Sequence, residues 1–144
     1  NERVPLFYNK IKKLMGTVEG KIFAILGLSF KPDTDDMREA KSVELIKYLL
    51  TDNAIIKAYD PAAMPIAKKI LPPNIQYCEN AYESAKDADA LVVCTEWREF
   101  KLLNMQKIKQ IMKTPIIFDG RNIYDPKIKQ RYGFAYYGIG RKTN

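Results

Sequence analysis

The sequence of 144 residues contains no histidine, and cysteine occurs only at Cys78 and Cys94. Without histidine the chain lacks the usual general base of serine and cysteine hydrolases and the usual ligand of zinc sites, so no metal site is predicted. Two cysteines are too few for a disulfide framework, and a reduced, cytoplasmic setting fits this count. Both lie in apolar, strand-like segments without an activating base, so we interpret them as structural rather than nucleophilic.

Long hydrophobic runs are also missing. No apolar run approaches the ~20 residues that a membrane helix needs, and no signal-peptide pattern opens the chain, so we expect no membrane partner. The net charge is +7, but the lysines are spread along the chain. This distribution favours solvation and a small anionic ligand over nucleic acid. The remaining composition, 47% hydrophobic and 28% charged, is typical of one globular domain with its own core.

Apolar strands alternate with amphipathic helices along the whole sequence. The first helix has one apolar face, formed by Phe7, Ile11, Leu14 and Met15. Strands are predicted over residues 21–30, 54–61, 74–78, 89–97, 114–122 and 134–140, and helices over 7–15, 43–50, 62–70, 81–88, 104–113 and 125–133. This alternation predicts a single α/β domain: a doubly wound, mainly parallel, Rossmann-like sheet with helices on both faces.

The loop after the first strand, "SFKPDTDDMR" at 29–38, lacks the glycines of a dinucleotide-binding turn. An anion at this loop would therefore meet the charged tip of Lys31 rather than bare backbone. The following proline pushes Lys31 toward extended backbone, which holds its side chain out from the sheet edge. The loop aspartates are interpreted mostly as caps of the next helix and as ion-pair partners of Arg38; they are Asp33, Asp35 and Asp36.

A second charged loop, "FDGRN" at 118–122, follows the fifth predicted strand. Gly120 allows a tight turn, and Arg121 emerges at the edge with a planar fork suited to phosphate or sugar oxygens. The alternative is a surface arginine paired with Asp119 or Asp125. Because ligands of open parallel sheets bind beyond the carboxyl ends of the strands, Lys31 and Arg121 become candidates for one anion site.

Five segments together carry a family resemblance: "GLSFKPDTDDMREAKSVELIKYL", "YDPAA", "ADALVVCTEWREF", "IIFDGRNIYD" and "YYGIGR". In this order they resemble the C-terminal domain of the UDP-glucose/GDP-mannose dehydrogenase family, and the resemblance covers essentially the whole chain. It is greatest to the members that oxidise UDP-glucose. The resemblance implies an NAD-dependent enzyme that oxidises the sugar C6 hydroxyl to a carboxylate in two hydride transfers.

The resemblance also implies a division of labour within a longer parent protein. Residues 1–18 resemble the end of a helix that connects to a missing upstream region, and residues 19–144 resemble the UDP-sugar-binding domain. NAD would be bound mainly by a missing N-terminal domain, and the nucleophilic cysteine would belong to a missing central domain. No catalytic residue is therefore expected in this chain, which alone should be inactive, and the parent would be a homodimer or higher oligomer.

Carried over position by position, the family's substrate contacts fall on Phe30, Lys31 and Arg121, and its cofactor contact from this domain falls on Arg38. The segment 95–97, "TEW", is interpreted mainly as packing and turn structure. Two alternatives stay open: the same domain of a UDP-N-acetyl-mannosamine or other nucleotide-sugar dehydrogenase, and a free-standing nucleotide-binding module. A nucleic-acid binder is suggested by charge alone.

Overall fold

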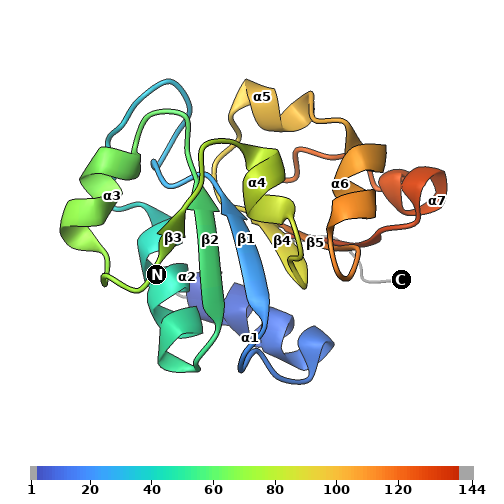
Figure 1. Cartoon of the computed structure of the whole chain (residues 1–144), viewed down its shortest axis with the longest axis horizontal. Coiled ribbons are helices and arrows are strands. Elements are labelled where there is room, and N and C mark those ends of the chain that lie inside the picture. The colour runs from blue at the N-terminus through green and yellow to red at the C-terminus, as the bar shows by residue number, and fades with distance from the viewer. Residues whose placement is uncertain (1–2, 140–144) are drawn as a thin grey trace.

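The computed structural model describes residues 3–139, which form one sheet covered by helices (Figure 1). Its strands are β1 Ile22–Leu26, β2 Ile55–Tyr59, β3 Gln76–Tyr77, β4 Ala90–Val93, β5 Ile116–Asp119 and β6 Ala135–Gly138. Their order is β3-β2-β1-β4-β5-β6, and every neighbouring pair is parallel. The predicted parallel α/β sheet is confirmed. The predicted last strand and the segment "YYGIGR" extend into residues 140–144, outside the described part.

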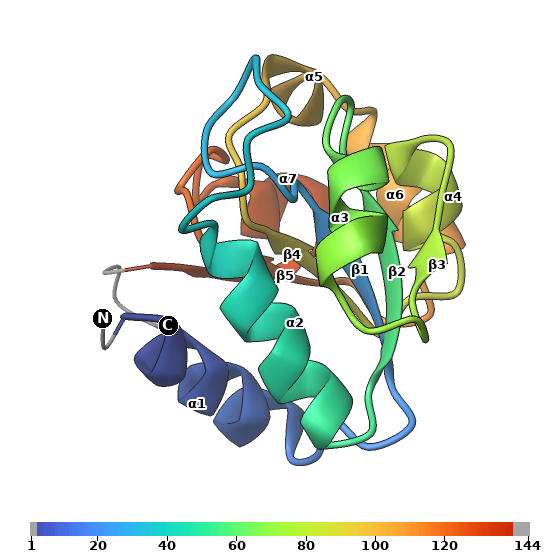
Figure 2. The same ribbon diagram turned by 90° about the vertical axis from the view of Figure 1, so that its left-hand side faces the viewer.

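The helices lie on both faces of the sheet, as a doubly wound fold requires (Figures 1 and 2). They are α1 Arg3–Met15, α2 Lys41–Thr51, α3 Met64–Ile70, α4 Ala81–Ala85, α5 Arg98–Lys101, α6 Met105–Ile111 and α7 Ile128–Tyr132. Apolar residues of α1, α2 and the α3 region share one core cluster, and those of α4 to α7 share the other. Helix α5 was not predicted, because four residues are too short for a periodic pattern. No helix within residues 3–139 is long and apolar enough to cross a membrane.

The strand β1 shows how the sequence builds two cores. Phe23 and Ile25 belong to the cluster under α1 and α2, whereas Ala24 and Leu26 belong to the opposite one. Successive side chains of a strand point to opposite faces, so a continuous apolar run is needed where both faces are covered. Strand β1 therefore lies at the centre of the sheet with β2 on one side and β4 on the other.

Helix α1 packs against α2 beneath the sheet (Figure 2). Phe7 and Ile11 are buried as predicted, but Leu14 is 36% exposed, so its predicted place in the core is wrong. The buried face is rotated toward α2: the ring of Tyr8 stacks on that of Tyr48 at 5.2 Å, and the Tyr8 hydroxyl donates to Asp52. Residues 1–18 as a connector to an upstream region stay a prediction.

The loop aspartates do not cap the next helix. Helix α2 begins after Ala40, whose side chain makes no capping hydrogen bond, so the predicted caps are wrong. The reason is distance along the chain, since the last aspartate of the loop, Asp36, lies five positions before Lys41, the first helical residue. Asp36 instead forms an ion pair with Arg38, and that part of the prediction is confirmed.

Candidate functional site

Four strands end at one edge of the sheet, the upper edge in Figure 1. Leu26 at the end of β1 is aligned with Tyr59 of β2 and with Val93 of β4, and Val93 is aligned with Asp119 of β5. The loops that follow these strands therefore start at one level. Ligands of open parallel sheets bind beyond such an edge, and this is where the charged loops of the sequence lie.

A buried carboxylate, Asp60, joins the loops that follow β1 and β2. Its Oδ2 accepts from the backbone N–H groups of Leu28 at 2.7 Å and Ser29 at 3.0 Å. Its Oδ1 accepts from those of Ala62 and Ala63, both at 2.8 Å. Sequence reasoning missed this role. The available signal was an aspartate followed by proline directly after a predicted strand, a position that favours bonding to nearby backbone.

The turn after β1 contains glycine because another side chain occupies the space beside it. Gly27 has φ +97°, and a Cβ built on it would lie 2.5 Å from the Cβ of Thr95. The Thr95 hydroxyl donates to the Ser29 carbonyl at 2.6 Å. The Trp97 indole N–H donates to Ser29 Oγ at 3.2 Å and to Asp60 Oδ2 at 3.3 Å. Thr95 and Trp97 thus join the loop after β4 to the loop after β1, and their interpretation as packing residues stays a prediction.

Phe30 and Lys31 extend from this anchored loop into solvent. The Phe30 N–H donates to the Asp36 carbonyl at 3.0 Å, and Ser29 Oγ donates to the Lys31 carbonyl at 2.9 Å, so the backbone of both residues is held. Their side chains are exposed, and the ammonium of Lys31 lies 5.4 Å from the centre of the Phe30 ring. The pair presents a cation beside a flat apolar surface.

Arg121 is positioned by two carboxylates. Its backbone N–H donates to Asp119 Oδ1 at 3.1 Å, and its guanidinium Nη2 donates to Glu96 Oε2 at 2.6 Å. The guanidinium partner is thus Glu96 from the β4 loop, rather than Asp119 or Asp125. Burial alone would raise the pKa of Glu96, but the hydrogen bond and the positive charge of Arg121 hold that pKa below its usual value.

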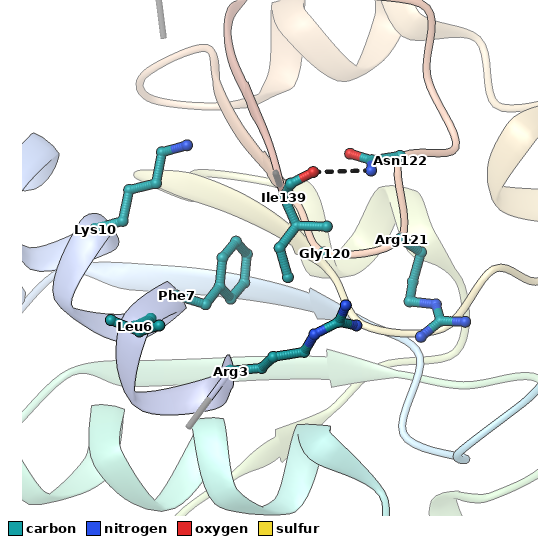
Figure 3. Close-up of a pocket in the computed structure, with 8 residues that line it drawn as sticks. All are labelled: Arg3, Leu6, Phe7, Lys10, Gly120, Arg121, Asn122 and Ile139. Atoms are coloured by element: carbon teal, nitrogen blue, oxygen red, sulfur yellow. Dashed lines mark hydrogen bonds between the residues drawn. The ribbon is translucent and has the colours of Figure 1, made fainter. Parts of the chain in front are cut away.

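A cavity of about 540 Å³ opens beside Arg121, between α1 and the ends of β5 and β6 (Figure 3). Its lining combines three cationic side chains with an apolar wall: Arg3, Leu6, Phe7, Lys10, Gly120, Arg121, Asn122 and Ile139. The size is typical of small-molecule sites, and this lining suits an anion that also carries an apolar group. Phe30, Lys31 and Arg38 are not among its lining residues.

Arg38 lies beside a different cavity, of about 510 Å³, together with residues of α3. Its guanidinium donates to both carboxylate oxygens of Asp36, with Nη2 2.6 Å from Oδ2. The side-chain hydrogen bonds from Arg38 lower the pKa of Asp36 to about 2. The structure thus places the candidate cofactor residue and the candidate substrate residue Arg121 at separate cavities.

Residues 24–126 match the sequence profile of the UDP-glucose/GDP-mannose dehydrogenase family, UDP binding domain. The chain belongs to this family. It is 42% identical over 143 residues to UDP-glucose 6-dehydrogenase YwqF of Bacillus subtilis, covering 99% of this chain and 32% of that protein. It is 43% identical over 136 residues to a UDP-glucose 6-dehydrogenase of Rickettsia conorii, covering 93% of this chain and 32% of that protein.

Solved structures of the family have the same fold as this chain. A UDP-glucose dehydrogenase from Pyrobaculum islandicum superposes with a TM-score of 0.81 at 26% identity, over 99% of this chain and 31% of that one. A UDP-D-ManNAc dehydrogenase from Pyrococcus horikoshii superposes with a TM-score of 0.76 at 28% identity, over 98% of this chain and 32% of that one. The resemblance read from the sequence is confirmed. This chain spans about a third of the length of the curated relatives it matches.

Each cysteine directly follows a strand: Cys78 comes after β3 and is buried, and Cys94 comes after β4 and is partly buried. Burial raises the pKa of Cys94 to about 12, even though the nearby charge of Arg121 acts in the opposite direction. Burial likewise raises the pKa of Cys78. A thiol is nucleophilic as its thiolate, so these shifts favour the protonated, less reactive form of both groups. Their interpretation as structural residues stays a prediction. Within residues 3–139, no three His, Cys, Asp or Glu side chains gather into a metal-type cluster.

Proposed function

We propose that this chain is the UDP-sugar-binding domain of an NAD-dependent UDP-glucose 6-dehydrogenase, with substrate contacts from Phe30, Lys31 and Arg121. The parent protein would oxidise UDP-glucose to UDP-glucuronate in two hydride transfers and would assemble as a homodimer or higher oligomer. The observation that carries the proposal is the position of Arg121. Its backbone and guanidinium are both held by carboxylates at the carboxyl edge, beside a cavity with cationic and apolar walls.

The two substrate loops offer complementary chemistry for a nucleotide diphosphate. Lys31 provides a mobile point charge, whereas Arg121 provides a planar fork that can donate two parallel hydrogen bonds to phosphate or sugar oxygens. Phe30 is 42% exposed, and its ring is a surface on which a base or ribose can pack. A ligand that contacts all three would join the β1 loop to the β5 loop across the edge of the sheet.

The residues of this chain do not fit a complete NAD site. In dinucleotide-binding turns, glycines let the pyrophosphate approach the backbone, but here the space beside Gly27 is filled by Thr95. We infer that an upstream domain binds NAD and supplies the nucleophilic cysteine, while this domain contributes Arg38 alone. Residues 1–18 would then connect to that upstream part and residues 19–144 would form the binding domain. The isolated chain should not reduce NAD⁺.

A second candidate keeps the domain and changes the sugar. The similarity to the Pyrococcus horikoshii UDP-D-ManNAc dehydrogenase extends over nearly the whole chain, so this architecture is compatible with another UDP-sugar. The proposed contacts of this domain address the nucleotide end. The sugar would therefore be discriminated by the upstream part of the protein, and activity with UDP-glucose compared with UDP-N-acetyl-mannosamine separates the two candidates.

The proposal is tested by steady-state kinetics of the full-length protein carrying Lys31→Ala or Arg121→Ala. A charge-assisted hydrogen bond is worth about 1.5–3 kcal/mol, so each loss should raise KM for UDP-glucose roughly tenfold to a hundredfold. Lys113→Ala is the matched control, because this exposed lysine precedes β5 and lies at the opposite edge of the sheet. If Lys31→Ala and Arg121→Ala behave like Lys113→Ala, both residues are ordinary surface charges and the assignment is wrong.

A further inference from the structure

The segment 95–97, between β4 and α5, contacts both loops of the proposed substrate site. Its outer residues reach the β1 loop: the Thr95 hydroxyl donates to the Ser29 carbonyl at 2.6 Å, and the Trp97 indole donates to Ser29 Oγ at 3.2 Å. Ser29 directly precedes Phe30 in the chain. The backbone on either side of Glu96 is therefore fixed against the loop that carries one half of the site.

The middle residue of the segment, Glu96, reaches the other half. Its Oε2 accepts from Arg121 Nη2 at 2.6 Å, and the two side chains are 29% and 36% exposed. The other oxygen, Oε1, is buried and accepts no hydrogen bond from the residues that the structure describes. Arginine is a long side chain with several rotatable bonds, so a short, half-buried contact at its tip fixes where the guanidinium plane lies.

We propose that Glu96 is a positioning residue for the nucleotide, acting through Arg121. The inference rests on the proposed function, in which Arg121 binds the UDP part of the substrate. Glu96 holds the guanidinium in the orientation that the ligand uses, so the side chain is ordered before the ligand arrives and less conformational entropy is lost on binding. The segment 95–97 thereby fixes the spacing between the β1 loop, which carries Lys31, and the β5 loop, which carries Arg121.

If Glu96 acted on the nucleotide only through its negative charge, and not by orienting Arg121, its replacement would change nucleotide binding in the opposite direction. A carboxylate beside a diphosphate site repels the anion, so replacing Glu96 by neutral glutamine would tighten nucleotide binding if charge were the dominant effect. If orientation dominates, the same substitution weakens binding. Glutamine keeps one acceptor oxygen but loses the charge that holds the guanidinium, so Arg121 populates further rotamers. The direction of the change in KM therefore separates the two effects.

The experiment is a double-mutant cycle in the full-length enzyme, with KM for UDP-glucose and kcat measured for Glu96→Gln, Arg121→Ala and the double variant. We expect Glu96→Gln to raise KM about threefold to tenfold, as the change from a charge-assisted to a neutral hydrogen bond implies, with kcat unchanged. In the Arg121→Ala background it should have no further effect. Glu99→Gln is the matched control, because it removes one negative charge near the same edge. Glu99 is an exposed residue of α5, and its carboxylate accepts from the Tyr59 hydroxyl.

Each outcome is decisive. If Arg121→Ala leaves KM unchanged, the substrate role of Arg121 fails and the proposed function is wrong at this residue. If Arg121→Ala weakens binding but Glu96→Gln has no effect, or tightens it, Arg121 keeps its role and the positioning role of Glu96 is overturned. An equal effect of Glu96→Gln in both backgrounds, or a fall in kcat together with a lower melting temperature, indicates a general structural role and also contradicts the proposal.

Discussion

Replacing Asp60 by alanine should remove a large fraction of the stability of the domain. The carboxylate accepts from four backbone N–H groups, and those of Leu28, Ser29 and Ala63 are buried, while that of Ala62 is partly buried. A buried donor left without an acceptor costs about 1–3 kcal/mol, so three of them cost about 3–9 kcal/mol. Domains of this kind are stable by about 5–15 kcal/mol in total. One side chain thus supports a large fraction of the free energy of unfolding.

Urea unfolding of the chain, followed by tryptophan fluorescence, measures this effect, because Trp97 donates to Asp60 and so reports on the same loops. Asp60→Asn keeps one acceptor oxygen, so we expect it to lose about half as much stability as Asp60→Ala. Asp125→Ala is the control, since the Asp125 carboxylate is exposed and accepts from the exposed N–H of Lys127, so its loss should cost under about 0.5 kcal/mol. A loss below about 1 kcal/mol for Asp60→Ala would mean that water satisfies these donors, and would refute the reasoning.

Three further predictions follow from contacts of single residues. Gly27→Ala should destabilise the domain by at least about 1–3 kcal/mol in urea unfolding, because φ is +97° and the added Cβ meets Thr95; a neutral effect would contradict this packing. Native Cys94 should react with iodoacetamide much more slowly near neutral pH than in the denatured chain, because burial raises its pKa to about 12, and its rate should rise with pH up to that value. Rapid native labelling would show that the thiol is accessible. Asp36 should keep its charge on acidification down to about pH 2, and Arg38→Gln should return its pKa toward 3.8, as carboxyl-carbon NMR would show; an unchanged titration would exclude the ion pair in solution.

The architecture could be predicted from the sequence because its signals are local. A continuous apolar run such as 21–30 is compatible with a strand covered on both faces, and the regular alternation of strands and helices leaves a parallel sheet as the simplest topology. The six predicted strands and six predicted helices all occur, and α5 is the additional element. The family resemblance depends on loop motifs at the carboxyl edge, which are contiguous in the sequence and therefore also readable from it.

The contacts within the candidate site could not be predicted, because they depend on register between strands. Alignment of Leu26 with Tyr59 brings Asp60 against the β1 loop, although the two lie more than thirty residues apart in the sequence. Alignment of Val93 with Asp119 brings Glu96 within reach of Arg121. A carboxylate has the same local sequence signal whether it caps a helix, pairs with a neighbour or supports a distant loop.

The sequence by itself determined the kind of fold, the family and the edge where charged side chains gather. The tertiary structure decided which carboxylate holds Arg121, why Gly27 is glycine, and that Arg38 lies at a separate cavity. The physical reason is the range of the interactions involved. Hydrophobic periodicity and turn preferences act over a few neighbouring residues, whereas a hydrogen bond between loops forms only after the packed sheet has set their separation to about 3 Å.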